Sequence, residues 1–526
     1  MSNTVLRKHW GFDGVIESDC GALSHIKDQH HYTSDGPHTA AASMNGTCDV
    51  ECDKVYSGNL LKAYTAGLVS KTQLADAARR IMTHRFKLGL FDDPRQNAYW
   101  SGKYNDSKTV HAPEHAAVAR EAAQQAVTIV QNEGGVLPLK STTKTFAVIG
   151  PLANVTDVFL GDYRPAACPG PAEPAPQGTA CLPTINELLT KRATSSKVIL
   201  AEGCGDEGDA GVPCSGSAVT PSVTSALQAA DVIVLVIGEK TTDNDKVGNT
   251  GGEGHDRSTV GLPGNQAELV VAALATKKPI VAIILSGGSV SVDALAGAPM
   301  TAVVYAGFGG ETGQNAIIDV IFGDVAASGR LPFTVYPESW GNATEMNDMS
   351  FQAGQGRSYK YLLPAVKPLY EFAAGLSYSK FSLASAASTP LALGSAPVQA
   401  CVTVTNSGAE PSPVVVTLFS STTRADLTGA SPRLIPNRQL IAFDKEHAAP
   451  SQKQTLCMEI SDKDVAMVDD AGAHIAYAGK YTLTFFDGAT KVTRQAVVAT
   501  TRIVATIPAV DNPQPPCCMG DKTTCC

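Results

Sequence analysis

Long apolar stretches and clusters of positive charge are both missing from this 526-residue sequence. No window of 18 uninterrupted apolar residues occurs, so we predict no membrane-spanning helix. No run of five or more basic residues occurs and the formal net charge is −9, which makes nucleic acids and anionic membranes poor partners. A neutral ligand such as a sugar suits this charge balance better.

The sequence holds no complete dinucleotide- or zinc-binding motif. A G-x-G-x-x-G occurs at residues 203–208 after the apolar run 197–201, but no helical pattern follows it directly, which argues against an NAD-type enzyme. The 13 cysteines lack the spacing of a zinc ribbon or finger, and no paired histidines complete such a set, so we expect disulfides. The close pairs are Cys48/Cys52, Cys168/Cys181 and Cys204/Cys214.

The first residues, MSNTVLRKHWGFDG, have no apolar core and no small-residue cleavage site, so they do not resemble a signal peptide. The cysteine pairs and the N-x-S/T sequons nevertheless favour an extracellular protein. We therefore expect the natural N-terminus to lie upstream of Met1. The four sequons are at Asn45, Asn105, Asn154 and Asn342.

The length predicts about three domains, at roughly 100–200 residues each. In residues 1–100, GVIESDC predicts a short strand that ends at Ser18–Asp19. Ser70 and Gln73 form a capping-box pattern that opens a helix ending near Gly89. The helix carries an apolar face of Leu74, Ala78, Ile81, Met82 and Phe86. Residues 92–113 are polar and predict a linker.

Residues 114–340 alternate helical and strand patterns. A helix is predicted over about 114–131, and apolar runs follow at 146–150, 197–201, 231–238, 279–286 and 301–306. Continuous rather than alternating apolar runs are typical of strands buried on both faces, as in a parallel α/β sheet. Ligands of such sheets bind beyond the carboxyl ends of the strands.

Residues 396–506 contain short β-rich runs separated by turns, which predicts a β-sandwich. Cys401 and Cys457 lie in two of these runs and could pair. Residues 341–395 form a Gly/Ser-rich connecting segment, and residues 507–526 form a tail rich in proline and cysteine.

Six segments, in a fixed order from about residue 3 to 500, together resemble glycoside hydrolase family 3. In the first, Leu6, Arg7, Trp10-Gly11-Phe12, Gly14 and Ser18-Asp19 match the family's nucleophile motif. The other five are RRIMTHRFKLGLFDDP; AREAAQQAVTIVQNEGGVLPL with FAVIGPLAN and LGDY; EGHDRSTVGLPGNQAELV; GDVAASGRLPFTVYP with GRSYKYL and YEFAAGLSYSKF; and VTVTNSG with RQLIAF.

The resemblance implies a multidomain α/β plus β architecture. Residues 1–100 would be the C-terminal part of a (β/α)8-type barrel, residues 114–340 an α/β sandwich domain, and residues 396–506 a fibronectin type III-like domain. Most of the barrel, including residues that grip the sugar, would lie upstream of this sequence. We therefore expect this chain alone not to turn over an aryl β-xyloside.

The reaction implied is retaining glycoside hydrolysis, which uses two carboxyl groups about 5–5.5 Å apart and needs no metal or cofactor. The resemblance makes Asp19 the nucleophile, at the end of a barrel strand where barrel active sites form. Without the resemblance, a helix-capping or turn aspartate would be the simpler interpretation.

Glu253 is the expected acid/base, on the loop that follows the run 231–238. Related sequences usually carry an earlier glutamate where Gly251 stands, and the loop is longer here, so Glu239 is kept as a second candidate. Glu253 could instead build the loop by pairing with Arg257. Asp256 and Arg257 are expected to shape this loop.

Cys20 directly after the nucleophile is typical of the β-xylosidase/α-arabinofuranosidase branch, as is the run Gly356-Arg357-Ser-Tyr359-Lys-Tyr361. The resemblance therefore implies hydrolysis of terminal β-xylosyl residues from xylo-oligosaccharides, with His30 and Tyr32 lining the pocket. A β-glucosidase and a catalytically inactive carbohydrate-binding fragment remain alternatives.

Overall fold

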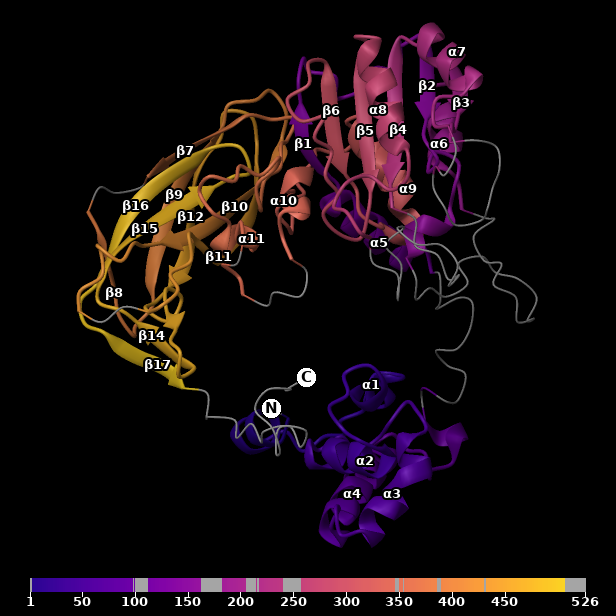
Figure 1. The fold of residues 1–526 in the computed structure, drawn as a ribbon. Helices are drawn as coiled ribbons and strands as arrows, with labels where there is room; N and C mark the ends of the chain where they lie inside the picture. Colours follow the sequence, from indigo (N-terminus) through magenta and orange to yellow (C-terminus); the bar gives the residue numbers. More distant parts are fainter. Residues whose placement is uncertain are drawn as a thin grey trace. The chain divides into compact units, whose positions relative to one another are not determined.

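The structure of this chain is a computed structural model. The residues described are 2–97, 99, 112–161, 182–204, 214, 217–239, 257–345, 350–352, 354–385, 389–429 and 432–506. The chain divides into two compact units (Figure 1). The first consists of Met1–Ala112 with Val468–Ile475 and Ile503–Cys526, and the second of Pro113–Met467 with Ala476–Arg502.

The first unit is mainly helical. Its elements are a π-helix at Ser2–His9, α1 (Ala22–Asp28), α2 (Gly36–Asn45), α3 (Val55–Thr65) and α4 (Lys71–Lys87), followed by a short 3-10 turn at Pro94–Gln96. The strand expected before Asp19 is reduced to a single parallel bridge between Glu17 and Val50. A two-segment β-pairing has little stability of its own, because it lacks neighbouring strands.

Helix α4 begins as the sequence predicts. The Ser70 side chain accepts a hydrogen bond from the Gln73 backbone, and the Gln73 side-chain oxygen accepts one from the Ser70 backbone, which completes a capping box. The expected apolar face is only partly covered, since Met82 is 39% exposed and Phe86 is 63% exposed. The residue of α4 that is fully buried is Ala77, which packs with α2 and α3.

The second unit contains a six-stranded sheet with the strand order β1-β6-β5-β4-β2-β3 (Figure 1). The strands are β1 (Thr128–Asn132), β2 (Thr145–Ile149), β3 (Lys197–Ala201), β4 (Val232–Gly238), β5 (Ile280–Leu285) and β6 (Thr301–Tyr305). Strands β2 to β6 are parallel, as the continuous apolar runs predict, and β1 pairs antiparallel with β6.

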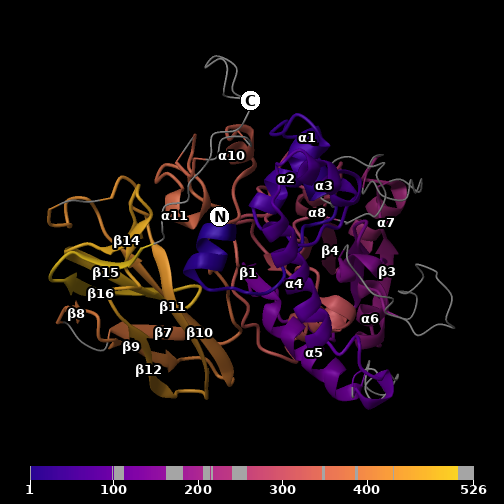
Figure 2. The ribbon, with the colours of Figure 1, turned by 90° about the horizontal axis from the view of Figure 1, so that it is seen from below.

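Helices cover both faces of this sheet (Figure 2). On one face lie α6 (Ile185–Arg192) and α9 (Gly313–Ile321), with α5 (Pro113–Ala126) against α9. On the other lie α7 (Pro221–Ala229) and α8 (Gln266–Ala275). Alternate residues of β4 enter the two apolar cores, because strand side chains alternate between faces. The result is three layers.

The helix predicted over 114–131 is too long. Helix α5 ends at Ala126, and Thr128, Ile129 and Val130 begin strand β1 instead. These three residues are β-branched, which favours a strand over a helix.

A β-sandwich follows in the same unit, after the short helices α10 (Glu338–Asn342) and α11 (Ser358–Tyr361). One sheet has the order β11-β10-β15-β16-β8 and the other β12-β9-β7. Their strands are β7 (Phe381–Ser385), β8 (Leu391–Leu393), β9 (Val398–Asn406), β10 (Ser412–Ser421), β11 (Gln439–Ala448), β12 (Lys453–Ile460), β15 (Gly479–Phe486) and β16 (Lys491–Val498). A further small sheet joins β13 (Met467–Val468), β14 (Ala473–Ala476) and β17 (Arg502–Thr506), most of whose residues belong to segments grouped with the first unit.

Arg330 links the α/β part of the second unit to the β-sandwich by hydrogen bonds. Its guanidinium donates to the carbonyl oxygens of Ser328 and Gly329 at 3.3 and 2.9 Å, and across to those of Val415 and Asp487 in the sandwich. Burial lowers the pKa of Arg330 to about 10. One buried cation therefore satisfies four carbonyl groups from both layers.

Candidate active site

Asp19 lies at the end of the segment that carries the parallel bridge. Its side chain is exposed and receives no hydrogen bond from any described residue, while its backbone carbonyl accepts from Ala22 at 3.2 Å, just as α1 begins. Gly21 precedes α1 with a φ of 79°, a conformation that suits glycine. The chain therefore turns sharply around Asp19 and leaves its carboxylate accessible.

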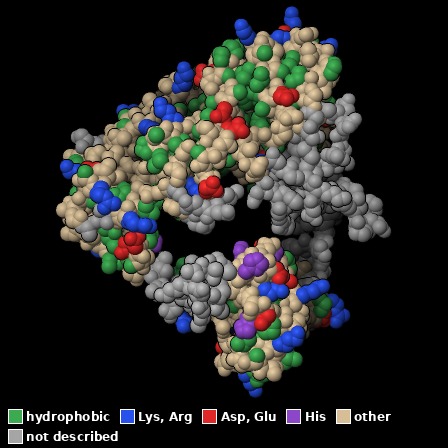
Figure 3. Space-filling view, viewed as in Figure 1, with side chains coloured by type: hydrophobic (Ala, Val, Ile, Leu, Met, Phe, Trp, Pro, Cys, Tyr) green, Lys and Arg blue, Asp and Glu red, His purple; other side chains and the backbone are tan. Residues whose placement is uncertain are grey.

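His30 and Tyr32 follow α1, in the same unit as Asp19. His30 is exposed and its backbone donates to His25 at 2.9 Å, and Tyr32 is half-buried with its backbone bonded to Ile26 at 2.9 Å. Figure 3 shows histidine side chains on the surface of this unit. No hydrogen bond joins Asp19 to either side chain among the described residues.

Asp49, which the sequence did not point to, holds together the segment that leads to Asp19. The Asp49 side chain is fully buried and accepts from Arg7 Nη2 at 2.6 Å, from Arg80 Nε and Nη2 at 3.0 and 2.7 Å, and from the Ile16 backbone at 3.0 Å. Arg7 and Arg80 both lie in segments that resemble the family. Their shared partner Asp49 is 42 residues from Arg7 and 31 residues from Arg80, so the sequence did not connect them.

Glu239, the second acid/base candidate, directly follows β4 at the carboxyl edge of the parallel sheet. It is 5% exposed, forms an ion pair with Arg257, and accepts from the Gly287 backbone at 3.2 Å. Burial raises the pKa of Glu239 above its usual range, although the Arg257 charge opposes this. A raised pKa is what a general acid needs, but the close guanidinium and the lack of exposure favour a structural role.

Arg257 cross-links three loops at this edge. Besides Glu239, it contacts the carbonyl oxygens of Gly261 at 2.9 Å and Ser289 at 3.0 Å. Glu253 and Asp256 lie outside the described residues, so the acid/base role of Glu253 and its alternative pairing with Arg257 both stay predictions. The described partner of Arg257 is Glu239.

The predicted pairing of Cys48 with Cys52 is wrong. Cys52 bonds to Cys20, 32 residues away, and Cys48 is a free thiol. Cys48 instead approaches the Val50 carbonyl at 3.2 Å, and burial raises its pKa. A four-residue spacing brings two cysteines close in sequence but does not aim their side chains at each other.

The other described cysteines pair as expected. Cys204 bonds to Cys214, and Cys401 bonds to Cys457 directly across the β9–β12 ladder. The pair Cys168/Cys181 lies outside the described residues.

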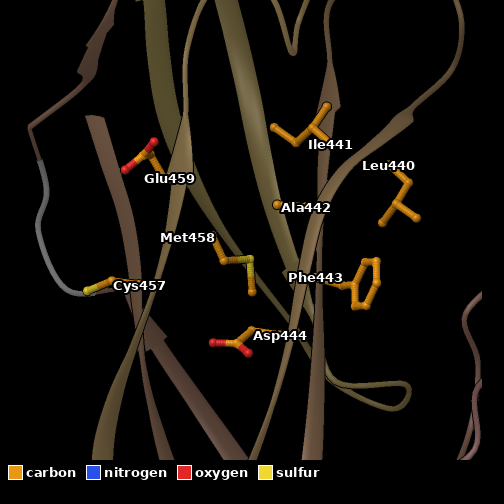
Figure 4. Close-up of a pocket in the computed structure, with 8 residues that line it drawn as sticks. All are labelled: Leu440, Ile441, Ala442, Phe443, Asp444, Cys457, Met458 and Glu459. Carbon is orange, nitrogen blue, oxygen red and sulfur yellow. The ribbon is translucent and has the colours of Figure 1, made fainter. Parts of the chain in front are cut away.

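A groove of about 480 Å³ lies on the β-sandwich, far in sequence from these groups (Figure 4). Residues 440–444 of β11 and 457–459 of β12 line it, and Asp444 lies near Met458 between the strands. It contains none of the expected site residues. Within the described part of the chain, no helix is long and apolar enough to cross a bilayer, and no cluster of three or more metal-ligating side chains occurs.

Comparison with known proteins identifies relatives of both units. Residues 127–378 match the Glycosyl hydrolase family 3 C-terminal domain. The Aspergillus flavus protein named "Probable exo-1,4-beta-xylosidase bxlB" is 30% identical over 507 residues, which cover 92% of this chain and 60% of that protein. The chain thus spans less than two thirds of this relative's length.

Two solved structures share the fold. One is a GH3 exo-beta-xylosidase (XlnD) in complex with a xylobiose aziridine activity based probe; it is 24% identical with a TM-score of 0.79, covering 96% of this chain and 64% of that chain. The other is the β-glucosidase EmGH1 from Erythrobacter marinus, 26% identical with a TM-score of 0.73, covering 94% and 64%. Residues 127–378 therefore belong to the glycoside hydrolase family 3 C-terminal domain family, and nearly the whole chain shares its fold with a GH3 exo-beta-xylosidase.

Proposed function

We propose that this chain is part of a retaining exo-β-xylosidase that releases terminal β-xylosyl residues from xylo-oligosaccharides. The observation that carries the proposal is Asp19, an exposed carboxylate at a sharp turn within the family's nucleophile motif. The name of the Aspergillus flavus relative supports the substrate class. Cys20 supports it too, because its sulfur is engaged in a disulfide and the position carries no aromatic side chain.

In the proposed reaction, Asp19 attacks the anomeric carbon and forms a glycosyl-enzyme intermediate. Glu253 first protonates the leaving oxygen and then deprotonates the water that releases the sugar. An exposed aspartate is well solvated, which suits a nucleophile that must carry a charge. The burial of Glu239 against Arg257 makes it the weaker choice for the acid/base role.

His30 and Tyr32 are proposed to contact the sugar, since both follow α1 within 13 positions of the nucleophile. Residues 1–100 are proposed to be the C-terminal part of a (β/α)8-type barrel, which fits the parallel pairing of Glu17 with Val50. The sandwich of residues 396–506 is proposed to be fibronectin type III-like. The three disulfides among the described residues support an extracellular location.

The central test is turnover of an aryl β-xyloside by the natural protein that contains this chain, compared with its Asp19→Asn variant. We expect loss of turnover in the variant, retention of anomeric configuration in the first product seen by NMR, and a labelled peptide containing Asp19 after treatment with a xylose-configured aziridine. A normal rate in Asp19→Asn would refute the assignment.

Glu253 is tested by leaving-group dependence. Glu253→Ala should slow hydrolysis of xylobiose far more than that of an activated aryl xyloside, because only the poor leaving group needs protonation. Glu239→Gln serves as the matched control and should not produce this selectivity. Equal losses on both substrates in Glu253→Ala would remove Glu253 from the acid role.

A β-glucosidase is the second proposed function, favoured by the fold shared with EmGH1. The ratio of kcat/KM for matched aryl β-xylosides and β-glucosides separates the two activities. A non-enzymatic carbohydrate-binding fragment would bind xylo-oligosaccharides without turning over either substrate.

A further inference from the structure

Hydrogen bonds join the turn that carries Asp19 to residues 50–52, both before and after Asp19. Before Asp19, the Ser18 backbone donates to the Val50 carbonyl at 2.9 Å, and the Ser18 hydroxyl accepts from the Cys52 backbone at 3.2 Å. After Asp19, the Gly21 backbone donates to the Cys52 carbonyl at 3.2 Å. Cys52 therefore contacts the chain on either side of the nucleophile.

The only covalent link in this arrangement is the disulfide between Cys20 and Cys52. Both cysteines are exposed, so the three hydrogen bonds around them compete with water. A covalent bond does not face this competition. The Ile16 backbone, three residues before Asp19, donates a hydrogen bond to the Asp49 carboxylate at 3.0 Å and is the next fixed point of the chain.

The Asp19 side chain itself has no described hydrogen-bond partner, so the direction of its carboxylate depends on the backbone of the turn. Displacement at an anomeric carbon needs the attacking oxygen in line, and a misplacement of about 1 Å can cost about 100-fold in rate. A nucleophile without side-chain supports gains more from a rigid backbone than one that is held by several donors.

We propose that the Cys20–Cys52 disulfide is a positioning element for the nucleophile, so that the reaction rate depends on this bond being oxidised. The inference rests on the proposed role of Asp19. The disulfide takes no part in the chemistry, and it acts by fixing the turn of residues 18–21 against Cys52.

The test compares two double variants. Cys20→Ala/Cys52→Ala removes the proposed positioning bond, and Cys401→Ala/Cys457→Ala removes the sandwich bond as a control. Hydrogen exchange is measured on the full chain, and peptides covering residues 17–22 should exchange about 10-fold faster or more in the first variant only. Unchanged exchange in these peptides would refute the proposal.

Kinetics are measured in the form of the protein that hydrolyses an aryl β-xyloside. In the first variant we expect kcat to fall about 10-fold or more, with KM changed by less than about 2-fold, because binding groups are unaffected and only the attacking atom moves. The control variant should keep its kcat, and a reductant should then lower it. Equal losses in both variants, or faster exchange with an unchanged kcat, would overturn the proposal.

Failure of the proposed function can be distinguished from failure of the disulfide proposal. If Asp19 is never labelled by a xylose-configured aziridine and no aryl glycoside is cleaved, the nucleophile assignment fails. Hydrogen exchange then still decides whether this disulfide fixes the turn.

Discussion

Replacing Asp49 by asparagine should destabilise the first unit strongly. Asp49 is the shared acceptor for Arg7, Arg80 and the Ile16 backbone, and its side chain is fully buried. The two arginine side chains are themselves only 10% and 12% exposed. Asparagine keeps the shape but removes the charge, so both guanidinium groups lose their counter-ion without a route to water.

Breaking a buried ion pair from one side typically costs about 3–5 kcal/mol. Asparagine retains one carbonyl acceptor, so we expect a loss at the lower end, about 3 kcal/mol in the free energy of unfolding. In a domain of this size each kcal/mol lowers the melting temperature by about 4–8 °C, which gives a fall of about 12 °C or more.

Hydrogen exchange with mass spectrometry is a suitable assay, because it reports opening free energies for peptides of the first unit separately from the second. Asp28→Asn is the matched control, since Asp28 pairs with Lys27 at the surface, where their side chains are 55% and 40% exposed. Such pairs contribute about 0–1 kcal/mol. If Asp49→Asn costs no more than Asp28→Asn, the view that Asp49 organises this unit is refuted.

Three further predictions concern the second unit. Arg330→Met should lower its free energy of unfolding in urea by about 3 kcal/mol, because four carbonyl groups lose a charged donor, and a loss below about 1 kcal/mol would contradict the role assigned to Arg330. Because burial raises the pKa of Glu239, the folded state binds more protons than the unfolded state above the ordinary value near 4.3. The stability of the wild type relative to Glu239→Gln should therefore fall as the pH rises from about 4 to 7, and a rise would show that Arg257 outweighs burial. Gly238→Ala should destabilise the unit while Gly288→Ala should not, because an added Cβ would lie 2.0 Å from the Leu285 carbonyl oxygen at the first site and would meet nothing within 4 Å at the second. Similar melting temperatures for the two alanine variants would be inconsistent with this.

The continuous apolar runs in the sequence were enough to predict the central strands of the sheet in the second unit. Strands β4 and β5 are buried along almost their whole length, so each appears in the sequence as a continuous apolar run. Strand β1 was missed because it follows α5 after one residue and its edge position gives it a mixed composition. Capping at Ser70 was predicted because its signal is confined to four residues.

The candidate site was harder to predict because its supports are long-range. Asp19 was found through its motif, but nothing local in the sequence connects Asp49 to Arg7 or Cys52 to Cys20. Such contacts depend on how the chain returns to itself, which residue spacing alone does not specify. The pairing of Cys52 with the nearer Cys48 was predicted for this reason and was wrong.

The free Cys48 has a consequence for oxidative folding. In the unfolded chain it is only four residues from Cys52 and competes with Cys20, which is 32 residues away from the same partner. Short loops close more readily than long ones, so mispaired species with a 48–52 bond should accumulate early and need thiol–disulfide exchange to resolve. Once the chain has folded, burial raises the pKa of Cys48. Little thiolate then remains to attack the Cys20–Cys52 disulfide. Production of this protein should accordingly benefit from a disulfide isomerase or from Cys48→Ser.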